Sequence, residues 1–354
     1  MNKTILHNQH INLGARMGEF GGWDMPIQYD GIIKEHHQTR NICSVFDICH
    51  MGEIEVIGKN AEVDLNRLLT ADISSMSINQ VKYSFMLNDQ GGVIDDLTVY
   101  KIGIDHFMLV VNAATIEVDF QWILNNLSPS TKAINVSDEY GKIDVQGPKS
   151  KEILNKLLHG TVDNLSYFWF KKIDNLIVSR TGYTGELGYE IYIPLNDVNK
   201  WWNMLLENSL CKPGGLGARD TLRLEMGYPL YGHELTNDLS PTSFSERAFI
   251  NFKKDFIGKN NALKELNHPS KKIIGLKFNS KRAAREGDSV FLGNDKIGII
   301  TSGSISPSLE RAIAIAKVNY YETFDSELSV KIRDKNYLAE VCTFPFYNDG
   351  TARN

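Results

Sequence analysis

Two adjacent aspartates, Asp95 and Asp96, interrupt an apolar run in the segment Leu87 to Tyr100. The segment starts at a polar turn with the paired glycines Gly91 and Gly92, and it continues with the β-branched and aromatic residues typical of a strand. Neighbouring side chains on a strand point to opposite faces, so only one of the two carboxylates faces inward. An inward carboxylate is costly unless it is paired or takes part in chemistry. Two interpretations stay open: a hairpin whose aspartate caps the turn, and a functional site.

A glycine-rich segment, Arg180 to Ile193, is the second candidate for a functional site, with the sequence RTGYTGELGYEIYI. Three glycines between two β-patterned runs indicate a tight loop whose shape serves a function. The segment contains neither GxxxxGK[ST] nor GxGxxG, so it is not a phosphate loop of either kind.

Two arginines lie four residues apart on a helix predicted for Ala218 to Met226. Arg219 and Arg223 therefore share one helical face. Either arginine could bind an anionic ligand, or both could form ion pairs with Asp220 and Glu225. The pattern does not decide between these interpretations.

The elements that must position these residues alternate between strands and helices without the long βαβ rhythm of a doubly wound fold, which indicates an α+β body. The patterns predict strands at 44–56, 82–87, 93–100, 107–111, 143–146 and 175–179, and helices at 31–41, 60–69, 115–121, 150–158 and 198–206. The helix at 31–41 is mostly polar and is expected to be largely exposed to solvent.

The pattern changes beyond Leu263, where short strand candidates follow one another at 272–278, 289–292, 298–301, 313–318 and 328–333. Such a series predicts an all-β domain of about 80 residues, a small barrel or a sandwich. The turn at Asn267 to Ser270 is the expected boundary. The predicted domains are thus 1–266, a catalytic region of two interleaved α+β subdomains, and 271–354.

Length and composition limit the classes of function. The 354 residues predict two or three domains, and the net charge of −5 argues against a dedicated nucleic-acid binder. The four cysteines show no spacing for zinc and suit a reducing compartment. The N-terminus lacks the apolar core of a signal peptide, and no apolar run approaches 18 residues. We therefore expect a cytoplasmic protein without a membrane segment.

Several segments, taken together and in order, resemble the glycine cleavage T-proteins, a family of folate-dependent aminomethyltransferases. The resemblance covers nearly the whole chain. The matching segments are Leu13 to Pro26, Phe46 to Gly52, Leu87 to Tyr100, Val110 to Thr115, Val145 to Pro148, Arg180 to Glu190, Gly215 to Glu225, Leu230 to Glu234, Asp255 to Lys259 and Ile300 to Leu309.

The resemblance implies a three-domain ring around a central channel for tetrahydrofolate, with the C-terminal β domain as one of the three. It also implies a reaction. The enzyme would take the aminomethyl group from the lipoyl arm of the carrier H-protein, release ammonia and form 5,10-methylenetetrahydrofolate. Folate is the acceptor substrate, and the chemistry requires neither a metal nor a covalent nucleophile.

The resemblance also implies roles for individual residues. Asp95 matches the acid beside the folate nitrogen N10, where a carboxylate can stabilise an iminium-like carbon and handle the amine protons. Glu190 matches the acid that binds the pterin ring, because a carboxylate can accept two parallel N–H bonds. Arg223 matches an arginine near the glutamate tail of folate, although the neighbouring Arg219 could take this part. Further positions that match the lining of the channel are Met51, Tyr83, Asn112, Tyr183 and, more weakly, Tyr231.

The chain departs from the family pattern at three places. Cys49 stands where the family has a serine, a small-residue exchange in the core. The segment Thr242 to Ala248 replaces a run that contains an acid and is followed by a tryptophan, which affects local packing and a contact with the channel wall or the carrier. Asn348 stands where a basic residue is expected near the chain end, although Arg353 lies close in sequence.

Three hypotheses for the function follow. The first is the aminomethyltransferase with H-protein as donor. The second is a related folate-dependent demethylase that acts on a small methylated amine or sulfonium compound, and the altered segment Thr242 to Ala248 keeps this alternative open. The third is a folate-binding module without transferase activity. The intact segments around Asp95, Glu190 and Arg223 favour an enzyme.

Overall fold

The computed structural model describes residues 1–244, 249–324 and 327–353. The chain forms two compact units. Unit 1 contains Met1–Ser84, Leu97–Asp220 and Gly350–Asn354, and unit 2 contains Phe85–Asp96 and Thr221–Asp349. The unit boundary falls inside two strands and one helix, so each unit is built from segments that are distant in sequence.

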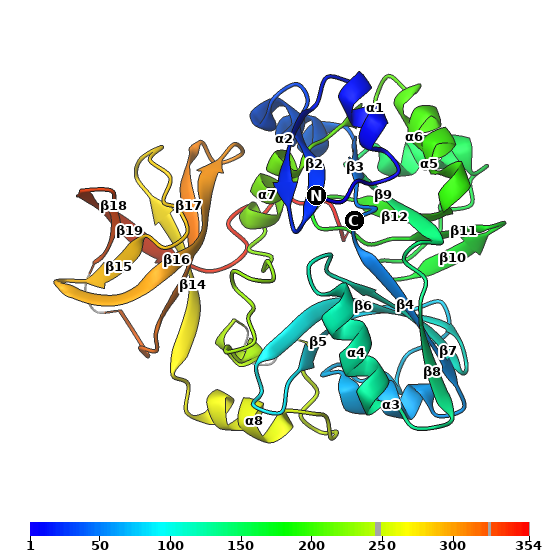
Figure 1. The fold of residues 1–354 in the computed structure, drawn as a ribbon. Coiled ribbons are helices and arrows are strands. Elements are labelled where there is room, and N and C mark those ends of the chain that lie inside the picture. The colour runs from blue at the N-terminus through cyan, green and yellow to red at the C-terminus, as the bar shows by residue number, and fades with distance from the viewer. Residues whose placement is uncertain (245–248, 325–326, 354) are drawn as a thin grey trace. The chain divides into compact units, whose positions relative to one another are not determined.

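A six-stranded sheet forms the first half of unit 1 (Figure 1). Its order is β10 (Phe170–Ile173), β11 (Leu176–Ser179), β12 (Gly188–Pro194), β9 (Tyr140–Gln146), β3 (Ser44–Asp47) and β13 (Lys212–Pro213). The associated elements are α1 (His7–Asn12), β1 (Arg16–Phe20), β2 (Trp23–Gln28), α2 (Ile32–Asn41), α5 (Ser150–Leu157), η1 (Leu195–Asp197) and α6 (Val198–Leu206).

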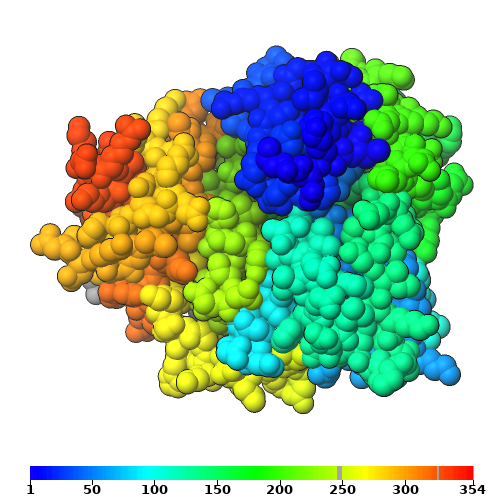
Figure 2. Space-filling model, in the orientation of Figure 1, coloured from blue at the N-terminus to red at the C-terminus, as the bar shows by residue number. Residues whose placement is uncertain are grey.

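The core of this half lies between the sheet and the helices α5 and α6. Val198, Trp202 and Leu205 follow one another at helical spacing and are buried against the sheet. Gln9 of α1 donates a hydrogen bond to Asn199 of α6 at 3.2 Å. In Figure 2 the dark blue N-terminal residues accordingly lie beside green atoms of the later part of unit 1.

A five-stranded sheet forms the second half of unit 1, in the order β5-β6-β7-β4-β8. Its strands are β5 (Val81–Leu87), β6 (Val93–Gly103), β7 (His106–Val111), β4 (Gly52–Gly58) and β8 (Thr131–Asn135), and its helices are α3 (Ala61–Leu68) and α4 (Ile116–Asn126). Both helices contact β8, and they contact each other (Figure 1). The end of β5 and the start of β6 belong to unit 2.

Unit 2 contains a closed six-stranded barrel. The elements of this unit are η2 (Pro241–Ser243), α8 (Lys259–Asn267), β14 (Lys271–Phe278), β15 (Ser289–Leu292), β16 (Asp295–Ser306), β17 (Arg311–Asn319), β18 (Leu328–Ile332) and β19 (Lys335–Cys342). Small residues of β17 (Ala312, Ala314 and Ala316) belong to the interior cluster, because a barrel of six strands leaves little room inside. The helix α7 (Leu216–Glu225) is divided between the two units.

The predicted α+β architecture and the C-terminal all-β domain are confirmed, and the β domain is a barrel. The boundary at Asn267 to Ser270 lies inside unit 2 and stays a prediction, as does the division of residues 1–266 into two subdomains. The sequence pattern missed β19, whose residues Lys335–Cys342 alternate weakly and include two charged side chains.

Two local predictions were wrong. The run 44–56 was expected to be one strand, but it is divided into β3 and β4 by a turn that contains Cys49, His50 and Met51. The helix α2 was expected to be largely solvated, yet Glu35, His36, Thr39 and Arg40 are buried. The helix was predicted to be exposed because its residues are polar. In the structure, hydrogen bonds of Glu35 and Thr39 and an ion pair of Arg40 hold these side chains inside unit 1.

Among the described residues, no helix is both long enough and apolar enough to cross a membrane. The cytoplasmic location stays a prediction.

Candidate functional site

One face of strand β9 is buried and polar. Successive side chains of a strand alternate between the two faces, and here Ile143 and Val145 enter the apolar core of unit 1. The opposite face carries Lys142, Asp144 and Gln146, of which none exposes more than 2% of its surface. Charged groups are removed from water only at a large cost, so this face requires partners for each of them.

Strand β12 brings a second carboxylate to this face. In the antiparallel register of β12 and β9, Glu190 lies directly opposite Asp144, and Tyr192 lies opposite Lys142. Two like charges opposite each other on one face destabilise a sheet. The charges of the two carboxylates therefore have to be balanced by nearby cations, an arrangement that is common in buried functional sites.

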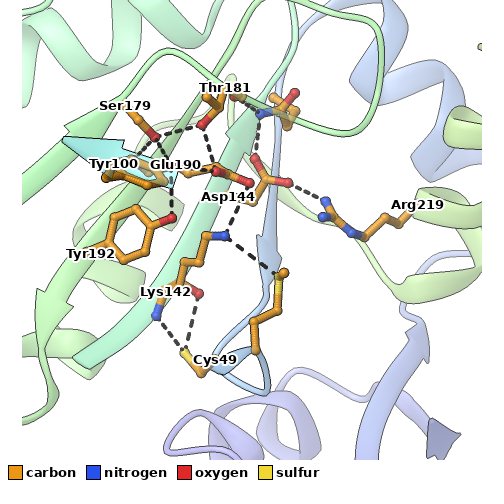
Figure 3. Close-up of polar contacts among 11 residues, drawn as sticks. Cys49, Tyr100, Lys142, Asp144, Ser179, Thr181, Glu190, Tyr192 and Arg219 are labelled. Carbon is orange, nitrogen blue, oxygen red and sulfur yellow. Dashed lines mark hydrogen bonds and ion pairs between the residues drawn. The ribbon is translucent and has the colours of Figure 1, made fainter. Parts of the chain in front are cut away.

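The carboxylate of Glu190 is held by an ammonium group and two hydroxyl groups (Figure 3). Lys142 Nζ lies 3.5 Å from Oε1, Thr181 Oγ1 donates to Oε2 at 2.6 Å, and the hydroxyl of Tyr100 donates to Oε2 at 3.3 Å. Burial alone would raise the pKa of Glu190, but Lys142 and Thr181 together hold it below its usual value. Glu190 is therefore an ionised hydrogen-bond acceptor at neutral pH.

The carboxylate of Asp144 is held by different partners. Arg219 Nη1 donates to Oδ2, and Gln146 Nε2 donates to Oδ1 at 2.5 Å. Burial raises the pKa of Asp144 to about 6, and the neighbouring Glu190 adds to this effect although Arg219 opposes it. Each carboxylate of the opposed pair thus has its own cation.

The network extends to two further residues that the sequence had proposed for the site. The guanidinium carbon of Arg219 lies 5.2 Å from the centre of the Tyr183 ring, in a cation–π contact. Met51 Sδ lies 3.7 Å from Lys142 Nζ. The structure therefore brings Met51, Tyr183 and Glu190 together around Lys142, Asp144 and Arg219.

The loop that carries Tyr183 and Glu190 is fastened by a buried ion pair. Arg40 Nη1 donates to Glu186 Oε1 at 2.8 Å and to the carbonyl oxygen of Thr184 at 2.6 Å. Thr351 donates to the other oxygen of Glu186 at 2.5 Å. A Cβ added to Gly188 would lie 2.1 Å from the Gln146 amide, so a larger residue here would displace the Gln146 side chain.

We expect Glu186→Gln to lower the free energy of unfolding by about 3–5 kcal/mol, because it removes the charge of the buried carboxylate that pairs with Arg40. Urea unfolding followed by circular dichroism measures the change. The matched control is Asp30→Asn, which removes an exposed partner of Lys34 and should leave the transition in place. Equal destabilisation by the two variants would contradict this role of Glu186.

The two aspartates of the hairpin formed by β5 and β6 differ in burial. Asp95 is completely buried and Asp96 is half-buried, as expected for neighbours on one strand. The turn itself is held by Asn88, whose Oδ1 accepts the N–H of Gly92 at 2.9 Å. Asn88 thus makes the capping contact that the first interpretation had assigned to an aspartate.

The hairpin turn is also fastened to other segments of unit 2. Asn88 Nδ2 donates to the carbonyl oxygen of Asn237 at 2.9 Å, and Asn261 Nδ2 donates to that of Asp89 at 2.8 Å. A Cβ at Gly92 would lie 1.8 Å from the Asn237 oxygen. The second glycine of the pair is therefore required by close packing.

Two family models match the chain. Residues 6–254 match the GCVT N-terminal domain, and residues 271–348 match the glycine cleavage T-protein C-terminal barrel domain. The chain belongs to the glycine cleavage T-protein family.

Relatives of the same family are similar over their full length. A protein from Pseudothermotoga lettingae named aminomethyltransferase is 42% identical, with 98% of each chain covered. One of the same name from Caldanaerobacter subterraneus subsp. tengcongensis is 43% identical, with 98% of this chain and 96% of the relative covered. The crystal structure of glycine cleavage system aminomethyltransferase T from Bartonella henselae matches with a TM-score of 0.94 at 30% identity and covers 99% of each chain. The resemblance predicted from the sequence is confirmed.

The remaining T-protein site candidates are distributed over the two units. Tyr83 lies on β5 and Asn112 follows β7, both half-buried in unit 1. In unit 2, Tyr231 forms an isolated bridge with Leu235. The roles of these three residues at the folate stay predictions.

Arg223 has several partners within unit 2. Its Nη1 lies 3.2 Å from Glu234 Oε2 and also donates to the carbonyl oxygen of Tyr228, and its Nη2 donates to Ser302 at 2.8 Å. The side chain is buried. The partners found for Arg219 and Arg223 are thus Asp144 and Glu234, each from another element.

The sequence reasoning missed Lys142 and Asp144. Both lie in the segment Tyr140–Gln146, which was predicted to be a strand from residue 143 onward. The signal was present as charged residues at alternate positions, Lys142 and Asp144, between the apolar residues of a short strand. A strand with one apolar face and one charged face is usually half-exposed, and only the packing of the second sheet of unit 1 shows that this face is buried.

Proposed function

We propose that this protein is the aminomethyltransferase of a glycine cleavage system. It takes the methylene carbon of the aminomethyl group on the lipoyl arm of H-protein and transfers it to tetrahydrofolate. The carbon exchanges its bonds to the lipoyl sulfur and to the amine for bonds to N5 and N10 of the folate. The two protons of those nitrogens leave on the thiol and on ammonia, so 5,10-methylenetetrahydrofolate is the product.

One observation carries the proposal: a buried carboxylate face around Glu190, Lys142 and Asp144, in a chain that matches aminomethyltransferases from end to end. The prediction that the protein is an enzyme of this activity is confirmed by relatives of that name. The demethylase is not favoured, because the chain matches aminomethyltransferases over 98% of its length. Residues 245–248 of the altered segment lie outside the described residues.

Glu190 is suited to bind the pterin of the acceptor substrate. It is ionised, its position is fixed by Thr181 and Tyr100, and a carboxylate has about four lone-pair directions for hydrogen bonds. The pterin ring presents two adjacent N–H donors to such a group. Met51 and Tyr183 supply apolar surface beside it.

Asp95 is proposed as the group at the reacting carbon. A fully buried carboxylate can stabilise a cationic, iminium-like carbon and can accept or return an amine proton. Asp96, which is less buried, supports the hairpin. Among the described residues, no group of three or more His, Cys, Asp or Glu side chains could hold a metal ion.

Arg219 is a better candidate than Arg223 for a contact with the bound folate. It lies beside Tyr183 and in the same network as Glu190, and its side chain is 13% exposed. Arg223 is 3% exposed and is engaged by Glu234 and Ser302. Arg223, the residue favoured by the family resemblance, is therefore proposed to stabilise unit 2.

The experiment that tests the function uses aminomethylated H-protein and tetrahydrofolate. Ammonia and 5,10-methylenetetrahydrofolate should appear together, in equal amounts and only when all three components are present. A T-protein of known activity serves as the control that the carrier is competent. Failure to release ammonia in a folate-dependent way from that carrier would refute the proposal.

A further inference from the structure

We propose that Thr351 is a positioning residue for the acceptor substrate. It holds the loop 180–187, the glycine-rich segment that carries Tyr183 and leads to Glu190. The proposal rests on the proposed function, in which these two side chains contact the folate. Thr351 lies 164 positions beyond the end of the loop in sequence, and it acts through the loop and not on the ligand.

The loop 180–187 carries or orients several groups of the site. Tyr183 lies within it, and Thr181 donates to the Glu190 carboxylate at 2.6 Å. The loop contains no helix or strand before β12 begins, so no regular ladder of backbone hydrogen bonds fixes it. Its shape therefore depends on contacts with other segments of unit 1.

The dipeptide Thr351–Ala352 binds both ends of this loop. At the start of the loop, Arg180 Nη2 donates to the carbonyl oxygen of Ala352 at 3.2 Å. At its end, the N–H of Ala352 donates to the carbonyl oxygen of Gly185 at 3.0 Å. The N–H of Leu187 donates to Thr351 Oγ1 at 2.9 Å. The two ends of the loop are thus joined through one dipeptide.

Thr351 also binds the buried carboxylate of the loop. Glu186 Oε1 pairs with Arg40 at 2.8 Å, and its Oε2 accepts the Thr351 N–H at 3.2 Å and the Thr351 hydroxyl at 2.5 Å. The hydroxyl therefore donates its one hydrogen to Glu186 and accepts the N–H of Leu187 with a lone pair. Valine has nearly the same shape but can make neither contact. The exchange Thr351→Val would thus remove two contacts of the loop at once.

A loosened loop is expected to weaken binding and to leave the chemical step unchanged. When the binding conformation is populated for only a fraction of the time, the Kd rises by the inverse of that fraction. The reacting carbon is assigned to Asp95, which the loop does not carry. At saturating folate the loop is ordered by the ligand, so kcat should be retained. A purely structural role would lower the unfolding temperature and leave the affinity of the folded protein unchanged.

The test compares Thr351→Val with Thr351→Ser, which keeps the hydroxyl. The Kd for tetrahydrofolate is measured by isothermal titration calorimetry without oxygen, and kcat is measured from ammonia release at saturating folate. We expect Thr351→Val to raise the Kd about three- to tenfold, because one of the two lost hydrogen bonds is to a charged group. Thr351→Ser should stay within about twofold of the wild type, and kcat should be unchanged in both.

Thr131→Val is the matched control. It removes the hydroxyl of another threonine of unit 1, which is buried and lies 3.3 Å from the Ser128 hydroxyl. This threonine lies on β8, outside the loop and the dipeptide. The Kd for tetrahydrofolate and kcat should both equal those of the wild type.

Amide hydrogen exchange of the loop gives a readout that does not require the ligand. The N–H of Leu187 loses its acceptor in Thr351→Val, so peptides that cover 180–187 should exchange faster than in the wild type. In Thr351→Ser they should exchange as in the wild type. Peptides from β9, in the same sheet, should be unaffected in both variants.

A second variant tests the same role if Thr351→Val folds poorly. Ala352→Pro removes the N–H that Gly185 accepts, whereas Ala352→Ser keeps it. Only the proline variant should raise the Kd. If Thr351→Val and Ala352→Pro both bound tetrahydrofolate like the wild type, or if Thr351→Ser lost as much affinity as Thr351→Val, the positioning role would be wrong and the proposed function would stand. A wild-type protein that does not bind tetrahydrofolate would refute both.

Discussion

Asp95→Asn is expected to lower kcat about 10²- to 10⁴-fold, the range for a group that transfers a proton or stabilises charge in the transition state. Asparagine has nearly the same shape but cannot carry the negative charge or accept a proton. The Kd for tetrahydrofolate should change little, since the side chain is proposed to act on the migrating carbon. Ammonia release under saturating folate measures kcat, and calorimetry measures the Kd.

Asp96→Asn is the matched control for this prediction. Asp96 lies on the opposite face of the same strand, with the same change in charge and volume. Its turnover should stay close to that of the wild type. If the two variants lost activity equally, the choice of Asp95 as the inward, reactive carboxylate would be wrong.

Glu190→Gln should have the opposite kinetic signature. An amide in place of the carboxylate presents an N–H group where the pterin also donates, and a charged hydrogen bond is replaced by a repulsive contact. Because charged hydrogen bonds contribute about 1.5–3 kcal/mol, the Kd for tetrahydrofolate should rise about 10- to 100-fold. At saturating folate, kcat should remain within the range of the wild type.

Glu53→Gln provides the control for Glu190. Glu53 lies on β4, and burial raises its pKa to about 8, although Lys142 partly opposes this effect. Its carboxyl group is therefore mostly protonated at neutral pH, and the exchange to glutamine removes little charge. If Glu53→Gln raised the Kd for tetrahydrofolate as much as Glu190→Gln, the loss of affinity would reflect general disturbance of the buried polar site and not the loss of one carboxylate. Thermal unfolding of both variants identifies loss of fold.

The two arginines of α7 illustrate a limit of sequence periodicity. Positions 219 and 223 share a helical face, and the pattern offered the same interpretations for both. In the structure Arg219 contacts Asp144 and Tyr183 of unit 1, whereas Arg223 contacts Glu234 and Ser302 of unit 2. Helical spacing defines which side chains are neighbours on one helix, but the partners come from segments distant in sequence.

The polar face of β9 illustrates a second limit. Alternation of Lys142, Ile143, Asp144 and Val145 predicts a strand with one face in water. Burial of the polar face follows from the second sheet of unit 1, where Tyr100 of β6 reaches Glu190 and Tyr192. A strand pattern carries no information about what covers its polar face. The roles of Lys142 and Asp144 could therefore not be predicted from the sequence.

The sequence alone determined that the chain is an α+β protein with a C-terminal all-β domain, that it resembles the T-protein family, and that Asp95 and Asp96 must differ. These conclusions depend on local periodicity, turn residues and ordered motifs, which are properties of contiguous segments. Only the tertiary structure decided that Asn88 holds the turn, that Glu190 and Asp144 are opposed, and that Lys142 and Arg219 balance them. Strand register and burial are set by contacts between residues far apart in the chain. The electrostatic interaction of two charged side chains depends on their distance in the folded protein.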